Sequence, residues 1–355
     1  MILRPATDAD ERAWPTLLGR LPAGDFLHDP AWAAVAAFDG QPQRRFVLAD
    51  GDRLVGLVAP QVRRLPLGKT TWYVPHGPVL DYADASAAER LREIVAGLRR
   101  AAAEAGAIAV VLEPRLEAGS AALRALAGSG LRFADGTLQV RQTRLVELGT
   151  DDELLAGFDK DTRYSVRRAE REGVTVRVVD DGADVDPIDA LHALVHETRR
   201  RAGFPMPPLE RYRVAWRALA SVGRAAICEA RCDGELLASG LLVLEGERSF
   251  YLFSGSRREQ PGQSKRYASY ALQWAMMRLA RERGARTHDL WGVAPAGAGP
   301  DHPWHGVGLF KKGFGGREVT WAGSWDIVVD PTLYRLREAV GIMRHAARRL
   351  RGRTR

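Results

Sequence analysis

Lysine is scarce in this sequence, although positive charge is not. Of the 52 Lys plus Arg residues in the 355-residue chain, the lysines are Lys69, Lys160, Lys265, Lys311 and Lys312. Two of them stand side by side in LFKKGFGG, residues 309–316, next to a glycine-rich turn. An ammonium group is a compact point charge, whereas a planar guanidinium suits bidentate anions. The adjacent pair therefore marks this segment as a candidate site, and exposed turn residues are the alternative interpretation.

Cysteine is rarer still, and long apolar runs are missing. Cys228 and Cys232 lie on one predicted strand, where four residues span about 13 Å, which is too far for a disulfide. No apolar run approaches the roughly 20 residues that cross a bilayer. The N-terminal residues lack the basic-then-apolar layout of a signal peptide. These absences favour a reduced, cytoplasmic protein with the composition of a soluble two-domain chain.

Several familiar catalytic patterns are also absent. The sequence has no Gly-x-Ser-x-Gly elbow and no Gly-x4-Gly-Lys-Ser/Thr phosphate loop. His302 and His305 are not joined by cysteine or acidic residues at ligand spacing, so a polar loop is the simpler interpretation than a metal site. We therefore expect neither a metal nor a bound cofactor.

The net charge of +8 favours a polyanionic partner, unless arginine-rich usage alone explains it. Positive charge collects in residues 159–173, a predicted helix that Gly173 closes. Its cations share one face at i, i+3, i+7 and i+11, and they are Lys160, Arg163, Arg167 and Arg171. Such a stripe fits the phosphate backbone of a nucleic acid. The alternative is a solvated face paired with Glu170 and Glu172.

The C-terminal residues form a second basic segment. Six arginines occur between Arg344 and Arg355, and Leu333, Leu336 and Val340 line an apolar seam along the preceding helix. The segment fits an anionic membrane surface or RNA, and a disordered basic end is the alternative.

One order of elements occurs twice in the chain. Three strand-like segments, a helix and a short buried strand occupy residues 44–114 and again residues 225–292. Gly106 and Gly284 follow the two helices as C-caps. This layout is that of a GNAT acyltransferase fold, so we predict an α/β protein of two tandem GNAT-like domains. We expect residues 1–147 plus 331–355 to form the first domain, with the final helix packed back on it, and residues 148–330 the second.

The motifs of the second half resemble the Fem family of non-ribosomal peptidyltransferases. The similar segments are ARTHDLWGVAP, HPWHGVGLFKKGFGG and VTWAGSWDIVVDPTLYRL, together with DKDTRYSVRRAEREGVTV, ETRRRAGFPMPPLERY and WYVPHGPVLD upstream. They occur in the family's order and cover most of the chain. The chain resembles the compact members, because it lacks the heptads that a long helical arm needs.

This resemblance implies an activity and its residues. Fem enzymes transfer an aminoacyl group from aminoacyl-tRNA to an amine of a peptidoglycan precursor peptide. Lys311, after Phe310, is expected beside the carbonyl oxygen that becomes an oxyanion, whereas Lys312 is expected to be peripheral. Glu113 is expected in the peptide-binding cleft, either as a base or as an orienting carboxylate. Asp289 is expected to hold loops together, and Gly313, Gly315 and Gly316 to let the backbone pass close to substrate.

The resemblance also implies a set of substrate-binding residues. These are Tyr73, His76 and Gly77 in the first domain and Tyr251, Ser256 and Trp291 in the second. Compact members carry a lysine after the first-domain tryptophan, where this chain has Ala36 or its neighbours. Either Arg63, Arg64 or Lys69 replaces that lysine, or the acceptor differs from the usual nucleotide- or lipid-linked precursor.

Three functions stay open at this point. The first is tRNA-dependent transfer to a cell-wall peptide, with glycine as the expected amino acid, or a related tRNA-dependent peptide ligase of secondary metabolism. The second is an acyl-CoA N-acyltransferase, although SRREQPGQSKRY is a poor match to a pyrophosphate-binding turn. The third is a non-catalytic basic module, for which the environment of Lys311 would not matter.

Overall fold

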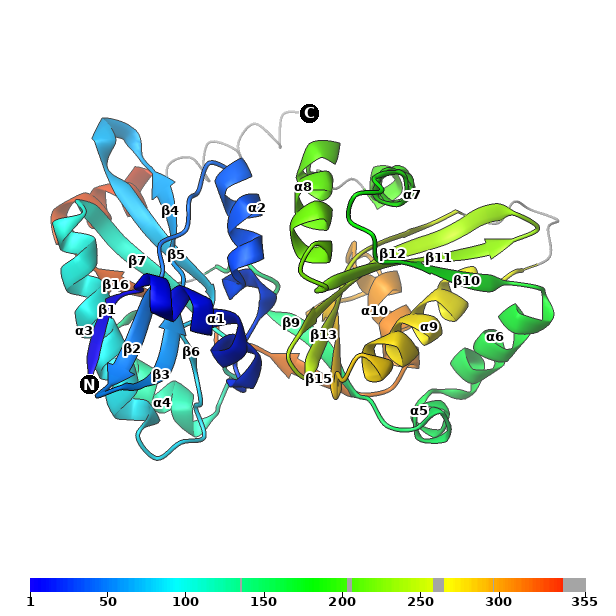
Figure 1. Cartoon of the computed structure of the whole chain (residues 1–355), viewed down its shortest axis with the longest axis horizontal. Coiled ribbons are helices and arrows are strands. Elements are labelled where there is room, and N and C mark those ends of the chain that lie inside the picture. The colour runs from blue at the N-terminus through cyan, green and yellow to red at the C-terminus, as the bar shows by residue number, and fades with distance from the viewer. Residues whose placement is uncertain (135, 203–205, 258–264, 296, 341–355) are drawn as a thin grey trace.

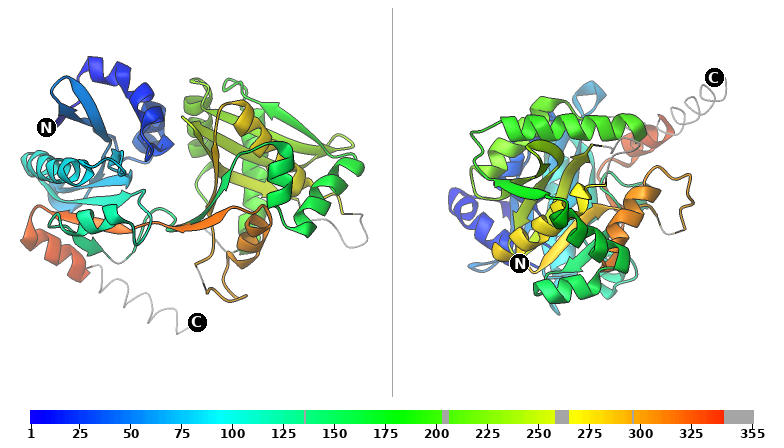
Figure 2. Two further views of the ribbon diagram at one scale, coloured as in Figure 1. Left: turned by 90° about the horizontal axis from the view of Figure 1, so that it is seen from below. Right: turned by 90° about the vertical axis from the view of Figure 1, so that its right-hand side faces the viewer.

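The computed structural model describes residues 1–355 except 135, 203–205, 258–264, 296 and 341–355. The chain forms two lobes that lie side by side, with the N-terminus on the first (Figure 1). Figure 2 shows that extended segments run between them. Among the described residues, no helix has the length and apolar character that crossing a membrane requires.

The first lobe contains two sheets. One has the strand order β1-β2-β3-β6 and the other β4-β5-β7-β16-β8. Its strands are β1 (Ile2–Pro5), β2 (Phe46–Asp50), β3 (Arg53–Val58), β4 (Gln61–Arg64), β5 (Thr70–His76), β6 (Val79–Leu80), β7 (Ala107–Pro114), β8 (Arg132–Ala134) and β16 (Ser324–Val328). Its helices are α1 (Asp8–Arg20), α2 (Ala33–Phe38), α3 (Ala87–Glu104) and α4 (Ala121–Ala127). The amphipathic helix α3 buries Leu91, Ile94 and Leu98 against these sheets.

The second lobe is built on one sheet with the strand order β10-β11-β12-β13-β14-β9-β15. Its strands are β9 (Gln142–Glu147), β10 (Thr175–Val179), β11 (Ala225–Cys232), β12 (Glu235–Glu245), β13 (Arg248–Ser256), β14 (Thr287–Gly292) and β15 (Arg317–Thr320). Its helices are α5 (Asp151–Gly157), α6 (Lys160–Arg171), α7 (Asp186–Ala202), α8 (Leu209–Ala220), α9 (Ala268–Glu282) and α10 (His305–Gly313). Cys228 and Cys232 are buried free thiols on β11.

The predicted duplication is confirmed. In each lobe the strand before the long helix pairs in parallel with the strand after it, β5 with β7 and β13 with β14. Gly106 and Gly284 follow α3 and α9 at φ values of 67° and 89°, where glycine avoids the strain that a side chain causes. The repeated order of strands and helices therefore reflects two copies of one fold.

The end of the chain returns to the first lobe, as predicted. Helical residues 331–340 follow β16, and Tyr334 is buried beside Ile108 and Ala109 of β7. The Tyr334 hydroxyl donates a hydrogen bond to Asp326 Oδ2 at 2.6 Å. The basic segment 344–355 lies outside the described residues.

Strand pairing suggests where the chain crosses between the lobes. β9 is hydrogen-bonded to β14 and β15 in the second sheet, whereas β16 is hydrogen-bonded to β7 in the first. We propose domain bounds near residues 141 and 323 rather than at 147 and 330. The segments 136–141 and 321–323 are then the two connections at the interface of the lobes.

Candidate functional site

Lys311 is buried in the last turn of α10, and only 7% of the residue is exposed. The two adjacent lysines therefore lie in a helix, and the alternative that they are exposed turn residues is wrong for Lys311. Lys311 Nζ donates a hydrogen bond to the carbonyl oxygen of Gly292, the last residue of β14, at 2.7 Å. Among the described residues, no carboxylate lies within ion-pair distance of this ammonium. Lys312 is exposed, so the two adjacent lysines occupy different environments.

Burial lowers the pKa of Lys311 to about 8, and the charge of Asp289 partly opposes this shift. The ordinary lysine pKa is 10.5. Near pH 7 the side chain is still mostly cationic, although water no longer stabilises the charge. Ionisable groups in this condition are concentrated at functional sites. Lys311 is therefore a fixed positive charge inside the protein.

The pKa of Lys311 predicts how this residue affects stability. Because the unfolded chain binds more protons between about pH 8 and 10.5, stability rises with pH over that interval. We expect Lys311→Met to exceed the wild type in free energy of unfolding by about 2–3 kcal/mol at pH 7. The difference should shrink by pH 10. Urea unfolding at both pH values measures it, and a variant that is less stable than wild type at pH 7 contradicts the prediction.

Phe310 and the three glycines fix α10 in the second lobe. The Phe310 ring packs against Tyr270 and Phe314, with centroid distances of 5.2 and 5.1 Å. A Cβ atom on Gly313 would lie 2.1 Å from Thr162 Oγ1. Cβ atoms on Gly315 and Gly316 would lie 2.3 and 2.2 Å from main-chain oxygens. These glycines let the chain pack closely on the backbone of α5 and β9 and on a side chain of α6, while their approach to substrate stays a prediction.

Two pockets lie around the segment 136–141, close to Lys311. We call the first the outer pocket. It has a volume of about 400 Å³ and is lined by residues 137–142, Val293, Pro295, His302, Pro303 and Trp304. A Cβ atom on Gly292 would lie 2.8 Å from Val140 and 3.2 Å from the Trp304 ring. The carbonyl that holds the ammonium therefore belongs to a residue packed directly behind the wall of the outer pocket.

The second, which we call the inner cavity, has about 10 Å³ of room and lies at the carboxyl ends of β5 and β7. His76, Glu113, Pro114, residues 137 and 139–141, Trp321 and Gly323 line it. Residues 137 and 139–141 thus form walls of both pockets.

Glu113 is fully occupied by hydrogen bonds beside the inner cavity. Its Oε2 accepts from the Tyr73 hydroxyl at 2.6 Å and from Gln139 N at 2.9 Å. Its Oε1 accepts from Ser324 Oγ and Leu138 N, both at 2.6 Å. Four donors leave this carboxylate no free acceptor position. The contacts favour the orienting role over the role of a base, because Glu113 fastens the segment 137–139 to the end of β7.

Buried charges join the two lobes. Arg115 Nη1 lies 3.2 Å from Asp25 Oδ2, and Arg115 Nη2 lies 2.9 Å from Asp289 Oδ2. Asp289 Oδ1 also accepts hydrogen bonds from Thr143 Oγ1 and from Trp291 N, as expected for a carboxylate that holds loops together. Sequence reasoning missed Asp25 and Arg115, since both stand in segments without a recognisable motif. The network fixes β14, and with it Gly292, against the first lobe.

The structure brings together some of the predicted substrate-binding residues. Tyr73, His76 and Gly77 lie at the end of β5, and the ring of Trp291 is centred 5.6 Å from that of His76. Lys311 Nζ lies 6.0 Å from the centroid of the Tyr251 ring. These residues surround the interface between the lobes.

Three predicted residues lie farther away. Arg64 and Lys69 are exposed near the tip of the β4–β5 hairpin, and Thr70, next to Lys69, is six residues from His76, about 20 Å along β5. Ser256 ends β13, five residues from Tyr251 and about 16 Å away along the strand. That Arg64 or Lys69 replaces the lysine absent around Ala36 stays a prediction.

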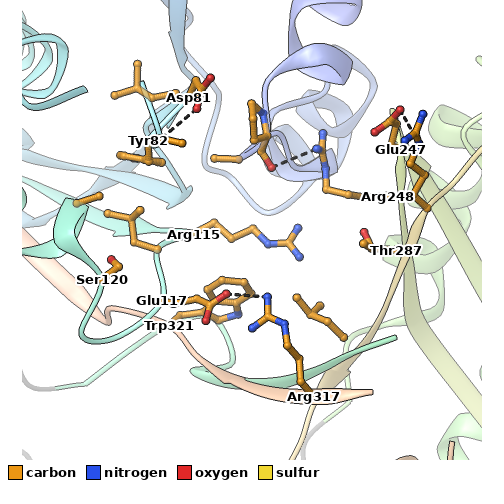
Figure 3. A pocket seen from close by; sticks show the side chains of 18 of the residues that line it. Asp81, Tyr82, Arg115, Glu117, Ser120, Glu247, Arg248, Thr287, Arg317 and Trp321 are labelled. Atoms are coloured by element: carbon orange, nitrogen blue, oxygen red, sulfur yellow. Dashed lines mark hydrogen bonds and ion pairs between the residues drawn. The ribbon is translucent and has the colours of Figure 1, made fainter. Parts of the chain in front are cut away.

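A larger cleft lies between the lobes, and none of the site residues predicted above lines it. It has a volume of about 1200 Å³, and Arg115, Arg248 and Arg317 extend into it from different elements (Figure 3). Arg317 pairs with Glu117 at 2.7 Å. Arg248 donates hydrogen bonds to the carbonyl oxygens of Leu18 in α1 and of Pro22 just after it. All three arginines are therefore paired with carboxylates or carbonyl oxygens of the protein itself. Lys311 does not line this cleft.

The basic face of α6 is partly confirmed as a free cationic surface. Lys160, Arg167 and Arg171 are exposed, and the described part of the chain offers them no ion pair. Glu172 instead pairs with Arg168 and Arg266. Arg163 differs, because its guanidinium donates to carbonyl oxygens at the end of α5, which favours a structural role. The N-terminus of α6 adjoins the end of α10, where Asp159 N donates to Gly313 O at 2.9 Å.

Comparisons with known proteins agree with this architecture. Residues 225–341 match the model of the FemAB family. The lipid II:glycine glycyltransferase of Staphylococcus saprophyticus is 25% identical over 90% of this chain and 92% of its own length. That of Staphylococcus aureus strain MRSA252 is 24% identical over 90% and 91%. The crystal structure of FemX superposes with a TM-score of 0.85 at 22% identity, covering 95% of this chain and 99% of that one. The second half of the chain is therefore similar to the FemAB family, and the whole chain has the fold of FemX.

These similarities agree with the resemblance found in the sequence, and the relatives are named as transferases. A tandem GNAT protein of clavulanic acid biosynthesis has the same general fold, with a TM-score of 0.51 at 16% identity. The competing pyrophosphate-binding turn falls partly on residues 258–264, and the Arg-Gly-Phe segment on 203–205, so both lie partly outside the described residues.

Proposed function

We propose that this protein is a FemAB family member and transfers an aminoacyl group from aminoacyl-tRNA to an amine of a peptidoglycan precursor peptide. The observation that carries the proposal is the buried Lys311 ammonium, which has a carbonyl and no carboxylate as its partner. A charge kept unneutralised behind a pocket wall is suited to an anion that forms only during reaction. The relatives named lipid II:glycine glycyltransferase support a lipid-linked precursor as acceptor and glycine as donor.

The distribution of positive charge on the surface indicates where the donor and the acceptor bind. The helix α6, which carries the exposed cations, begins next to the end of α10, where Lys311 lies. This arrangement suits a donor carried on RNA. The inner cavity and the end of β5 lie on the side of the first lobe, which suits the acceptor peptide. The reaction then takes place in the cytoplasm at the interface of the lobes, with the lipid carrier of the acceptor in the membrane.

The donor can be tested directly. The full-length protein is incubated with a lipid-linked precursor and either a charged tRNA pool, uncharged tRNA or acetyl-CoA. We expect the precursor to gain the mass of one amino acid residue with charged tRNA alone. A gain of one acetyl group from acetyl-CoA would establish the competing N-acyltransferase function, and no gain from any donor would leave only a binding role.

The proposal also predicts a change in salt dependence. Replacing Lys160, Arg167 and Arg171 together by Gln removes three phosphate contacts, so the slope of log affinity for tRNA against log salt should fall by about 2–3. A variant with Arg12, Arg53 and Arg92 replaced by Gln is the matched control, because it loses the same charge from exposed positions on the first lobe. Equal slopes in both variants would show that α6 does not contact RNA.

A further inference from the structure

His76 occupies an unusual position at the end of β5. Its backbone lies in the left-handed region at φ 47°, where a residue with a Cβ atom is strained. Only 3% of the residue is exposed, and it lines the inner cavity. Strained, buried polar residues are concentrated at functional sites. The mechanism outlined above assigns no chemical role to this imidazole.

The two ring nitrogens of His76 differ in their surroundings. Nδ1 lies 2.7 Å from Oδ2 of Asp25, which is completely buried. Asp25 is an anion, since His76, Arg115 and the Leu27 N–H together hold its pKa far below the usual value against the effect of burial. A carboxylate only accepts hydrogen bonds, so Nδ1 carries the proton and donates it to Asp25. In the neutral imidazole Nε2 is then an acceptor, and this buried atom has no hydrogen-bond partner among the described residues.

The position of His76 places this free acceptor near Trp291, the residue before the Gly292 that binds Lys311. The His76 ring is centred 5.6 Å from the Trp291 ring, and the next residue, Gly292, accepts the hydrogen bond of Lys311. The segment 137–141 lies between the inner cavity and the outer pocket and is fastened by its backbone to Glu113. One imidazole acceptor and one ammonium donor therefore flank the same short stretch of β14.

We propose that His76 is the general base of the transfer reaction and that Asp25 is its positioning residue. This inference rests on the function proposed above. When the segment 137–141 shifts, the inner cavity and the outer pocket become one space, and the acceptor amine contacts Nε2. Asp25 would act on His76 as the carboxylate does in other carboxylate–imidazole pairs, where it sets the tautomer and stabilises the imidazolium.

The proton balance of the step is complete with these groups. The neutral amine attacks the ester carbonyl carbon, a C–N bond forms, and the carbonyl electrons move to the oxygen, whose charge Lys311 stabilises. Nε2 takes the proton that the attacking nitrogen loses. The C–O bond to the ribose then breaks, and the departing ribose oxygen receives the proton back from Nε2. The products are an amide and a free ribose hydroxyl, with His76 neutral again.

His76→Gln is the primary test, because the amide can still donate to Asp25 but cannot take up a proton. We expect kcat to fall by about 10²–10³, with a small change in KM and an unaltered melting temperature. A general base acts only in its unprotonated form, so the wild-type rate should fall at acidic pH and His76→Gln should lose this acidic limb. The ionisable groups that face His76 from the elements around it are Asp25, His28, Arg115, Glu113 and Arg141. His196→Gln, an exposed position on α7, is the control.

A second variant and a spectroscopic measurement cover the case in which His76→Gln does not fold. Asp25→Asn should lower kcat and shift the acidic limb, since the amide no longer enforces the tautomer. ¹⁵N NMR of the histidine-labelled full chain should show one imidazole at pH 7 that is protonated on Nδ1 only and that changes in Asp25→Asn.

Each outcome decides between the two proposals. Active wild type together with an unchanged rate and pH profile in His76→Gln overturns the role of His76 alone. An imidazolium at pH 7 for this residue also overturns it. Wild type that transfers no aminoacyl group from any tRNA overturns the proposed function and this inference with it.

Discussion

Lys311→Ala should reduce turnover by about 10²–10³, which corresponds to about 2.7–4 kcal/mol of transition-state stabilisation. The carbonyl oxygen of an ester bears little charge before attack and a full negative charge in the tetrahedral intermediate. An ammonium that is already buried and held by Gly292 O needs no rearrangement when this charge develops. The effect should therefore appear in kcat rather than KM. Single-turnover rates with charged tRNA and precursor measure it.

Lys312→Ala is the matched control for this prediction. It removes the same charge from the adjacent residue, which is exposed, and its turnover should stay close to that of the wild type. A melting curve establishes that each variant is folded. Equal losses in the two variants would mean that general positive charge, rather than the buried ammonium, assists the reaction.

Arg115→Met should lower the free energy of unfolding by about 3–5 kcal/mol at pH 7. The substitution keeps much of the side-chain volume but leaves Asp25 and Asp289 buried without their shared cation. The loss should shrink only as the pH falls below about 4, because Arg115 helps to hold the pKa of Asp25 well below its ordinary value of 3.8. Urea unfolding at pH 7 and at pH 3 measures both values.

Arg317→Met is the control for Arg115, since its pair with Glu117 is about half exposed on both sides. Exposed pairs contribute about 0–1 kcal/mol, so a small loss is expected. A loss below 1 kcal/mol in Arg115→Met would show that the buried network does not hold the lobes together.

The sequence predicted the fold well because its signals are local and repeated. Strand alternation, the spacing of apolar residues in α3 and α9, and the glycines at 106 and 284 each specify a short segment, and their order recurs in the second half. The pairing of the strands at the two connections between the lobes was less predictable. The pairing of β9 with β15 and of β16 with β7 depends on contacts between segments far apart in the chain.

The site was predictable only where composition is unusual. Lys311 stood out because lysine is rare, and the structure buries it. Asp25 and Arg115 could not be found from the sequence, because nothing local distinguishes a buried charge from a solvated one. The same limit applies to the hydrogen bonds of Glu113, whose four donors come from three separate segments of the chain.

The most direct test of the central claim compares two adenosine-linked analogues of the donor. One carries the planar aminoacyl group as a stable amide, and the other carries a tetrahedral, negatively charged phosphonate in place of the carbonyl. Because catalysis requires stronger binding of the transition state than of the substrate, Lys311→Ala should weaken phosphonate binding by about 10²–10³. It should leave binding of the planar analogue nearly unchanged. Equal losses for both analogues, or no loss for either, would contradict the account.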